Sequence, residues 1–129
     1  MGQVKVFGLA SELNQYKAQL SEIIHSCLVS AFHLPADKKF HRFFPLHESD
    51  FIFPEGRTSR YTIIELSIFE GRSVETKKEL IHLLFLRLQQ ELSIQPADVE
   101  ITIFETPKSN WGIRGLPGDE LNLNYKVDI

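Results

Sequence analysis

The tetrapeptide LPAD at residues 34–37 recurs in the second part of the chain as QPAD at residues 95–98. The two Pro-Ala-Asp turns are 61 positions apart, and the segments that precede them also match in character. An internal repeat of this kind indicates a chain built from two similar halves. We expect one domain, residues 1–129, composed of pseudo-repeats at about 2–60 and 62–129.

An amphipathic pattern precedes each copy of the tetrapeptide. Apolar residues recur at the i, i+3 and i+4 spacing of a helix that buries one face. The two sets are related by a shift of 60 positions: Leu20, Ile23, Ile24, Leu28 and Phe32, and then Leu80, Leu83, Leu84, Leu88 and Leu92. The sequence therefore predicts one amphipathic helix in each half.

Strand-like stretches flank both predicted helices. VKVF (4–7) and YTIIELSIF (61–69) precede them, and FHRFF (40–44) and VEITIFE (99–105) follow;. The right-handed crossover rule makes the two strands of each half parallel and places the helix on one face. We predict an α/β (two-layer α+β) fold in which a four-stranded, mostly parallel sheet carries two helices on one face.

Two segments rich in turn residues follow the predicted units, PLHESDFIFPEGRTSR (45–60) and PKSNWGIRGLPGDE (107–120). We interpret each as a short hairpin plus a loop. The last stretch, LNLNYKVDI (121–129), alternates apolar and polar residues so strictly that it predicts a half-buried strand;. Such a strand needs a sheet edge, and an edge on a neighbouring subunit would supply one, which points to a closed oligomer.

Composition limits the classes of function. The 129 residues are 43% hydrophobic, enough for one core, and the net charge of -3 without a basic tract argues against nucleic acid;. The sequence shows neither a signal-peptide pattern nor an apolar run of membrane-span length, so we expect a soluble cytoplasmic protein. Cys27, the only cysteine, lies in an apolar run and is expected in the core;.

Two motifs, FEGRSVETKKELI (69–81) and NWGIRGLPGDE (110–120), resemble the tautomerase superfamily. The first is similar to the strand end, Gly-Arg-Ser turn and helix start of the short 4-oxalocrotonate tautomerase chains, and the second to their hairpin. The double length and the tryptophan in the hairpin are more similar to the malonate semialdehyde decarboxylase subgroup. The resemblance covers the whole chain and implies a βαβ-repeat homotrimer with active sites at the N-terminal end of the first strand.

The hallmark of that family is an N-terminal proline whose secondary amine serves as a general base or acid. This position aligns with Gly2. With Met1 removed, Gly2 would present a primary α-amine of reference pKa roughly 7.7 to 8.0. Such an amine can act as a weak base or form an imine with an oxo acid. With Met1 attached, the Gly2 nitrogen is an amide and can do neither.

The other family positions carry over one at a time. Arg72 matches the arginine that binds or polarises the oxo acid in the tautomerases, and also the second arginine of the decarboxylase's Arg-x-Arg pair. The first arginine of that pair falls on Glu70, and the decarboxylase's aspartate falls on Lys38, with Asp37 one residue early. Trp111 matches the aromatic wall of the pocket. The resemblance therefore implies an oxo-acid site but not the decarboxylase reaction itself.

The residues around Arg72 have two interpretations of their own. Gly71 and Arg72, followed by Ser73 as N-cap, can be no more than the turn into the helix. A guanidinium near a helix N-terminus is also suited to a carboxylate, because the dipole, free N–H groups and planar fork all favour an anion. The family position favours the second interpretation.

The remaining arginines also leave alternatives open. Arg42, among the aromatic residues of FHRFF, belongs either to a site or to the rim of the core;. Arg114 either lines the same pocket as Trp111 or is a solvated loop residue. Arg57 and Arg60 flank a turn and are expected to face water.

No motif indicates a metal, a cofactor or a serine or cysteine nucleophile. The five histidines lack metal-ligand spacing;. Three functions remain: an enzyme with altered chemistry that acts on a small oxo or unsaturated carboxylic acid, a non-catalytic module that binds a small anion, and a structural trimer. The first is the working prediction, with Arg72 and Gly2 as catalytic residues and Arg42, Trp111 and Arg114 as substrate-binding residues.

Overall fold

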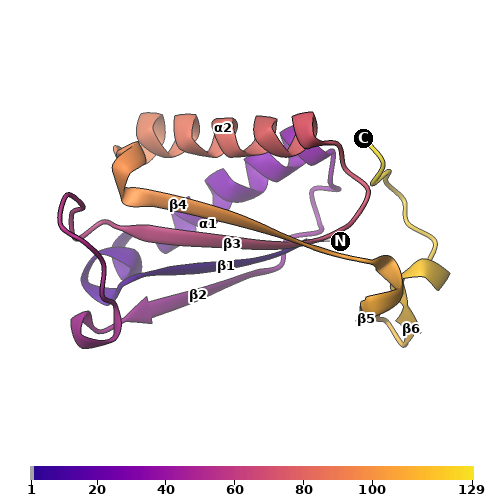
Figure 1. Cartoon of the computed structure of the whole chain (residues 1–129), viewed down its shortest axis with the longest axis horizontal. Coiled ribbons are helices and arrows are strands. Elements are labelled where there is room, and N and C mark those ends of the chain that lie inside the picture. The colour runs from indigo at the N-terminus through magenta and orange to yellow at the C-terminus, as the bar shows by residue number, and fades with distance from the viewer. Residues whose placement is uncertain (1) are drawn as a thin grey trace.

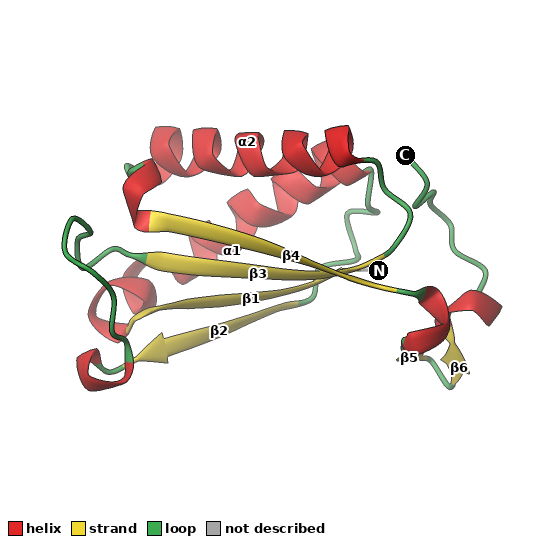
Figure 2. Ribbon diagram, viewed as in Figure 1, coloured by secondary structure: helices red, strands yellow, loops and turns green. Residues whose placement is uncertain are grey.

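The computed structural model describes residues 2–129, and the predicted strand, helix and strand of each half are present. The main elements are β1 (Gly2–Leu9), α1 (Ala10–Phe32), β2 (His41–Leu46), β3 (Thr62–Phe69), α2 (Val74–Leu92) and β4 (Val99–Thr106). A small hairpin of β5 (Gly112–Ile113) and β6 (Leu116–Pro117) follows them. Figure 2 shows the helices as one layer and the strands as another.

The strands form one four-stranded sheet in the order β2-β1-β3-β4. β1 pairs with β2 and β3 pairs with β4 in parallel, whereas the central pair, β1 and β3, is antiparallel. Both helices lie on the same face (Figure 1). The predicted two-layer fold with a mostly parallel sheet is therefore confirmed.

The core lies between the sheet and the two helices. Alternate residues of β1 and β3 point into it, and α1 and α2 contribute the stripes that their sequences predict. Fully buried members include Val4, Val6, Ile64, Leu66, Leu20, Ile24, Leu80, Leu84 and Leu88. Each such side chain stabilises the fold by roughly 1.5–3 kcal/mol. Cys27 is buried among them, and burial raises the pKa of its thiol to about 11, so it is a core residue as predicted.

The hairpin predicted in residues 45–60 does not form. After β2 the chain makes one 3-10 turn at Glu48–Asp50 and then an irregular loop. Aromatic rings of this loop pack on Tyr61, and the buried carboxylate of Asp98 accepts hydrogen bonds from the Thr58 N–H (2.7 Å) and hydroxyl (2.6 Å). These contacts fix the loop without strand pairing. The prediction of turns in this segment is therefore confirmed, and the prediction of a hairpin is wrong.

The hairpin predicted in residues 107–120 is confirmed as β5 and β6. Its two turn residues, Arg114 (φ 51°) and Gly115 (φ 83°), both lie in the left-handed region. Positive φ at both central positions is what a type I′ hairpin requires, because its twist matches that of the flanking strands.

The strand predicted in residues 121–129 is wrong. The segment has no regular secondary structure. Its alternating apolar residues Leu123, Tyr125 and Val127 pack against a small cluster around Phe69 and Trp111. One-sided packing on a cluster produces the same alternation as a half-buried strand, without an edge to pair with.

No helix in residues 2–129 is both long enough and apolar enough to cross a membrane.

Candidate functional site

The start of β1, the end of β3 and the start of α2 meet at one end of the sheet (Figure 1). Gly2 lies opposite Ile68 in the antiparallel pair, and β3 ends one residue later at Phe69. Gly71 then adopts φ 133°, a value that glycine tolerates far better than other residues;. Ser73 caps α2 by accepting a hydrogen bond from the Thr76 N–H (3.2 Å). This tight connection places Arg72 between a strand end and a helix N-terminus.

Arg72 is buried, with 4% of its surface exposed. Its guanidinium carbon lies 4.3 Å from the centroid of the Phe32 ring, at the end of α1. Nη1 donates one long hydrogen bond (3.4 Å) to the carbonyl oxygen of Phe69, whereas Nε and Nη2 are buried without a hydrogen-bond partner among residues 2–129. Burial lowers the pKa of Arg72 to about 10, and the Glu105 carboxylate opposes that shift. The group is therefore a cation at neutral pH.

No acidic side chain in residues 2–129 forms an ion pair with Arg72. Glu105, the carboxylate that acts on its pKa, is bound instead to Lys77 at 2.6 Å. A buried charge without a partner is unfavourable by several kcal/mol. Two free N–H groups on one planar fork match the two oxygens of a carboxylate, and the positive end of the α2 dipole favours an anion at this place. The arrangement is thus chemically suited to a small carboxylate.

Trp111 lies at the same end of the sheet. Its ring meets the Phe69 ring edge to face, with centroids 5.0 Å apart. Phe69, whose carbonyl accepts from Arg72, is therefore contacted by both predicted site residues. Sequence reasoning missed Phe69 as part of the site. The sequence offered one signal, the two consecutive apolar residues Ile68 and Phe69 at the end of the predicted strand, and both are buried in the structure.

Gly2 is buried at the first position of β1. A methyl group placed on its Cα would lie 3.7 Å from Leu34 Cδ1 and 3.8 Å from Ile68 Cγ2, which are ordinary contacts. Gly2 and Arg72 thus flank the end of β3, Gly2 across the sheet and Arg72 along the chain.

Within residues 2–129, neither Arg42 nor Arg114 makes a contact that joins it to Arg72. Arg42 lies opposite Lys5 in the sheet and donates from Nη2 to the Gln3 side chain at 3.2 Å. This position is on the sheet face that the helices leave uncovered. Arg114 is exposed in the β5–β6 turn.

Arg57 and Arg60 are more constrained than expected for residues that face water. Arg57 pairs with Glu100 at 3.3 Å, and Arg60 lies 3.8 Å from Glu12 and stacks on the Tyr16 ring. Both side chains are about 29% exposed. The expectation that these two residues face water is met only in part, because distant parts of the chain fold back to supply their partners.

Two histidines, the buried His25 and the partly buried His41, connect the first helix to the segment that follows it. His25 Nε2 lies 2.8 Å from the Ala36 carbonyl oxygen, and His41 Nδ1 lies 2.8 Å from Ser21 Oγ. Burial lowers the pKa of His41 to about 4. No group of three His, Cys, Asp or Glu side chains within residues 2–129 is placed to hold a metal ion.

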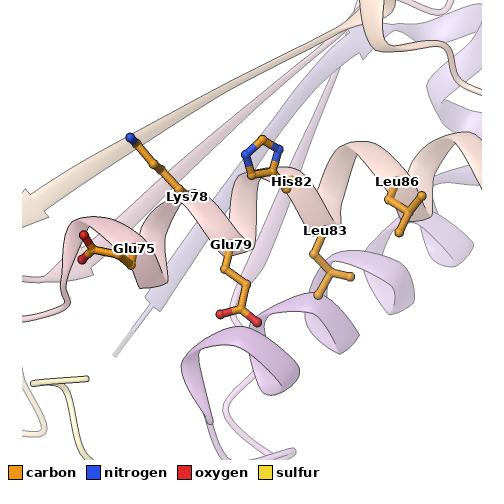
Figure 3. Close-up of a pocket in the computed structure, with 6 residues that line it drawn as sticks. All are labelled: Glu75, Lys78, Glu79, His82, Leu83 and Leu86. Atoms are coloured by element: carbon orange, nitrogen blue, oxygen red, sulfur yellow. The ribbon is translucent and has the colours of Figure 1, made fainter.

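A surface groove lies along the outer side of α2 (Figure 3). In Figure 3, Lys78 and His82 project to one side of the helix and Glu79 and Leu83 to the other. All of its lining residues come from this one helix. The groove contains none of the predicted site residues, and its polar groups do not converge on a common point.

Comparison with known proteins gives independent information. Residues 38–114, more than half of the chain, match the sequence model of a family described as tautomerase enzymes. The 2-hydroxymuconate tautomerase of Comamonas testosteroni is 37% identical over 57 residues, which are 44% of this chain and 90% of that protein. A protein of the same name from Pseudomonas putida is 38% identical over 60 residues, which are 46% of this chain and 95% of that protein.

Solved structures of proteins longer than these two relatives match nearly the whole chain. Malonate semialdehyde decarboxylase superimposes with a TM-score of 0.80 at 22% identity, covering 92% of this chain and 99% of that one. Native fused 4-OT gives a TM-score of 0.80 at 22% identity, covering 92% and 98%. At such identity these two likenesses show the fold alone. The family match and the tautomerase relatives together show that the chain belongs to the tautomerase family.

Proposed function

We propose that this protein binds a small oxo or unsaturated carboxylic acid at Arg72 and catalyses proton transfer or decarboxylation on it. The observation that carries the proposal is the buried Arg72 guanidinium with two unpaired N–H groups. A carboxylate would pair with both groups and neutralise the buried charge. The names of the relatives, a tautomerase and a decarboxylase, support these two classes of reaction.

Both reactions build negative charge on oxygen. In tautomerisation a base removes a proton from the carbon beside a carbonyl group, and the electron pair moves onto oxygen as an enolate before the proton returns elsewhere. In decarboxylation of a β-oxo acid, the bond to the carboxylate breaks and leaves carbon dioxide and an enolate. Arg72 would stabilise either enolate or hold the carboxylate. The Phe32 ring under the guanidinium strengthens such an interaction by excluding water on that side;.

The base in this proposal is the α-amine of Gly2, made available by removal of Met1. Gly2 begins β1 beside Ile68, one residue from Phe69. A glycine amine is primary, so besides taking up a proton it can condense with an oxo acid to an imine and release water. Imine formation by this primary amine is the altered chemistry that we propose, in place of the chemistry of an N-terminal proline.

We further propose that the protein works as a homotrimer. Solved fused 4-OT structures are described as asymmetric and symmetric trimers. The uncovered sheet face carries Phe7 stacked on Phe44, with ring centroids 4.7 Å apart, and an exposed Phe104. Arg42 shares this face, so in an oligomer it can act as a substrate-binding residue for a neighbouring copy, a role also proposed for Arg114. Sedimentation that shows only a monomer at micromolar concentration would refute the trimer.

The test of function uses protein whose mass verifies Gly2 as its first residue. We expect it to ketonise an enol of a 2-oxo acid or to decarboxylate a small β-oxo acid faster than Arg72→Ala. Protein that retains Met1 is the matched control, and it should lose the part of the activity that depends on the amine. Absence of turnover above Arg72→Ala contradicts the enzyme.

A non-catalytic anion-binding module is the second candidate. It is favoured by one observation, the presence of Gly2 where the family places proline, with Arg72 retained. Saturable binding of a small dicarboxylate that is lost in Arg72→Ala, without turnover, is the result that would select it. Absence of both binding and turnover would leave a structural trimer.

A further inference from the structure

Residues 121–129, the strap, run from the β5–β6 hairpin back to the start of α2 (Figure 1). At its end, the Ile129 backbone oxygen accepts hydrogen bonds from Thr76 Oγ1 (2.6 Å) and Ser73 Oγ (3.1 Å). Two residues earlier Val127 is 96% buried, with 4% exposed, and packs against Phe69. The strap is therefore attached to the same turn that carries Arg72.

The attachments lie on both sides of Arg72. On one side, Val127 is so close to Gly71 that a Cβ on this glycine would lie 3.1 Å from Val127 Cγ1. On the other side, Ser73 is bonded to Ile129. Tyr125 packs both against the main core, which includes Phe32, and against the Phe69 cluster. The Arg72 guanidinium contacts the Phe32 ring and the Phe69 carbonyl oxygen, so the strap is fixed to the residues on either side of Arg72 and packs on both clusters beside it.

The strap is held by few backbone interactions. Within residues 2–129 it makes no sheet pairing, and its backbone-to-backbone bonds are limited to Leu121 N–H with the Gly118 carbonyl (3.4 Å) and Ile129 N–H with the Val127 carbonyl (2.9 Å). The Tyr125 hydroxyl and two nitrogens of Arg72 are buried without a partner in the described part of the chain. Segments with few hydrogen bonds open at lower free energy than sheet strands, and unpaired buried polar groups favour opening further.

We propose that residues 121–129 act as a lid over the Arg72 site, which lifts to admit a carboxylate and closes over it. The ligand class in this inference rests on the proposed function, but opening of the strap does not. Closure would exclude water from the guanidinium and strengthen its interaction with the bound anion. The attachments at Val127 and Thr76 are the points that set how often the lid opens.

Opening is measured directly by the rate at which phenylglyoxal modifies Arg72, followed by peptide mass. The exposed Arg114 in the same protein serves as an internal reference. We expect Arg72 to react more slowly than Arg114 in the unaltered protein. Thr76→Val removes one hydrogen bond to the strap and should accelerate Arg72 modification about fivefold, and Val127→Ser should accelerate it more.

Val74→Ser is the matched control for Val127→Ser, because it makes the same change of side chain at a position outside the strap. Val74 is 56% exposed and lies at the start of α2. This variant should leave the Arg72 rate unchanged. Equal rates of Arg72 modification in Thr76→Val and in the unaltered protein would overturn the lid. If Val127→Ser does not fold, Thr76→Val alone decides the question. Failure of a 2-oxo acid to slow Arg72 modification in Thr76→Val would contradict the proposed function instead, leaving the lid intact.

Discussion

Two arginines lie over aromatic rings of α1 at opposite ends of the sheet, and they differ in what their N–H groups contact. Arg60, just before β3, stacks on Tyr16 at 4.9 Å, and Arg72, just after β3, stacks on Phe32 at 4.3 Å. Arg60 Nη1 donates to the carbonyl oxygen of Leu92 at 2.7 Å, and Nε lies 3.8 Å from Glu12. Arg72 has one bond of 3.4 Å.

The difference separates a structural arginine from a candidate binding arginine. Arg60 binds the C-terminal carbonyl groups of α2, including that of Ser93 at 3.2 Å, and thereby ties the helix to the loop before β3. Arg72 keeps two donors free inside the protein. Burial without a partner marks a candidate site more strongly than burial alone, because a ligand, a neighbouring chain or an ordered water can supply the missing partner.

The largest expected effect follows from removing the unpaired arginine. In Arg72→Met, binding of a small carboxylate should weaken by about 30-fold or more, since truncating one partner of a buried charge pair costs about 2–5 kcal/mol. The free energy of unfolding should not fall, because methionine fills similar volume without an unpaired charge. Calorimetric titration and urea unfolding measure the two quantities. Unchanged binding together with a large loss of stability would make Arg72 a structural residue.

The same change at the paired arginine should give the opposite pattern. Arg60→Met removes charged hydrogen bonds to two carbonyl groups and should lower the free energy of unfolding by about 2–3 kcal/mol;. Carboxylate binding should stay within about twofold of the unaltered protein. Urea unfolding and calorimetric titration again give both numbers. If Arg60→Met loses carboxylate binding but not stability, Arg60 rather than Arg72 is the binding arginine.

The end of the sheet that holds Arg72 also holds the partly buried His41, whose titration makes stability depend on pH. Burial first, and then the charges of His25 and Lys39, lower the pKa of His41 from 6.5 to about 4, with Glu22 opposing. Between these values the unfolded chain binds more protons than the folded one, so stability falls as the pH falls from about 6.5 toward 4. We expect about 2 kcal/mol less stability at about pH 5 than at about pH 7. Urea unfolding should show a flatter pH profile in His41→Gln, and an equally steep profile would contradict the assignment.

The smallest effect belongs to the well-paired end. Thr58→Val removes the hydroxyl bond to the buried Asp98 carboxylate but keeps the bond from the Thr58 N–H. The free energy of unfolding should fall by about 1 kcal/mol, with carboxylate binding unchanged. Thermal unfolding measured beside Thr102→Val, an exposed position on β4, controls for the change of side chain. A larger loss in the control than in Thr58→Val would show that the Asp98 contact contributes little.

Much of the fold could be predicted from periodicity, and less of the site. Stripes of apolar residues identified both helices and four strands, because those residues face one core. Alternation could not distinguish a strand from the strap, since Val127 and Tyr125 pack on one side in both cases. The order of the strands, with β1 beside β3, is set by contacts between halves that no local pattern encodes.

The contrast between the two arginines was also beyond the sequence. Both follow turn residues, and Gly71 and Ser73 correctly marked Arg72 as a strand-to-helix turn. Their partners are backbone carbonyl groups, Phe69 for Arg72 and Leu92 for Arg60. A carbonyl group is present at every residue, so side-chain identity cannot show which arginine is paired.

The proposal that Arg72, and not Arg60, binds a carboxylate is tested by an NMR titration of isotope-labelled protein with a small 2-oxo acid. The titration follows the Nε–H signals of the two arginines. The Arg72 Nε–H has no partner among residues 2–129, whereas Arg60 Nε already lies near Glu12. We predict a saturable downfield shift of the Arg72 Nε–H signal and no change at Arg60. A stationary Arg72 signal at saturating acid would contradict the account.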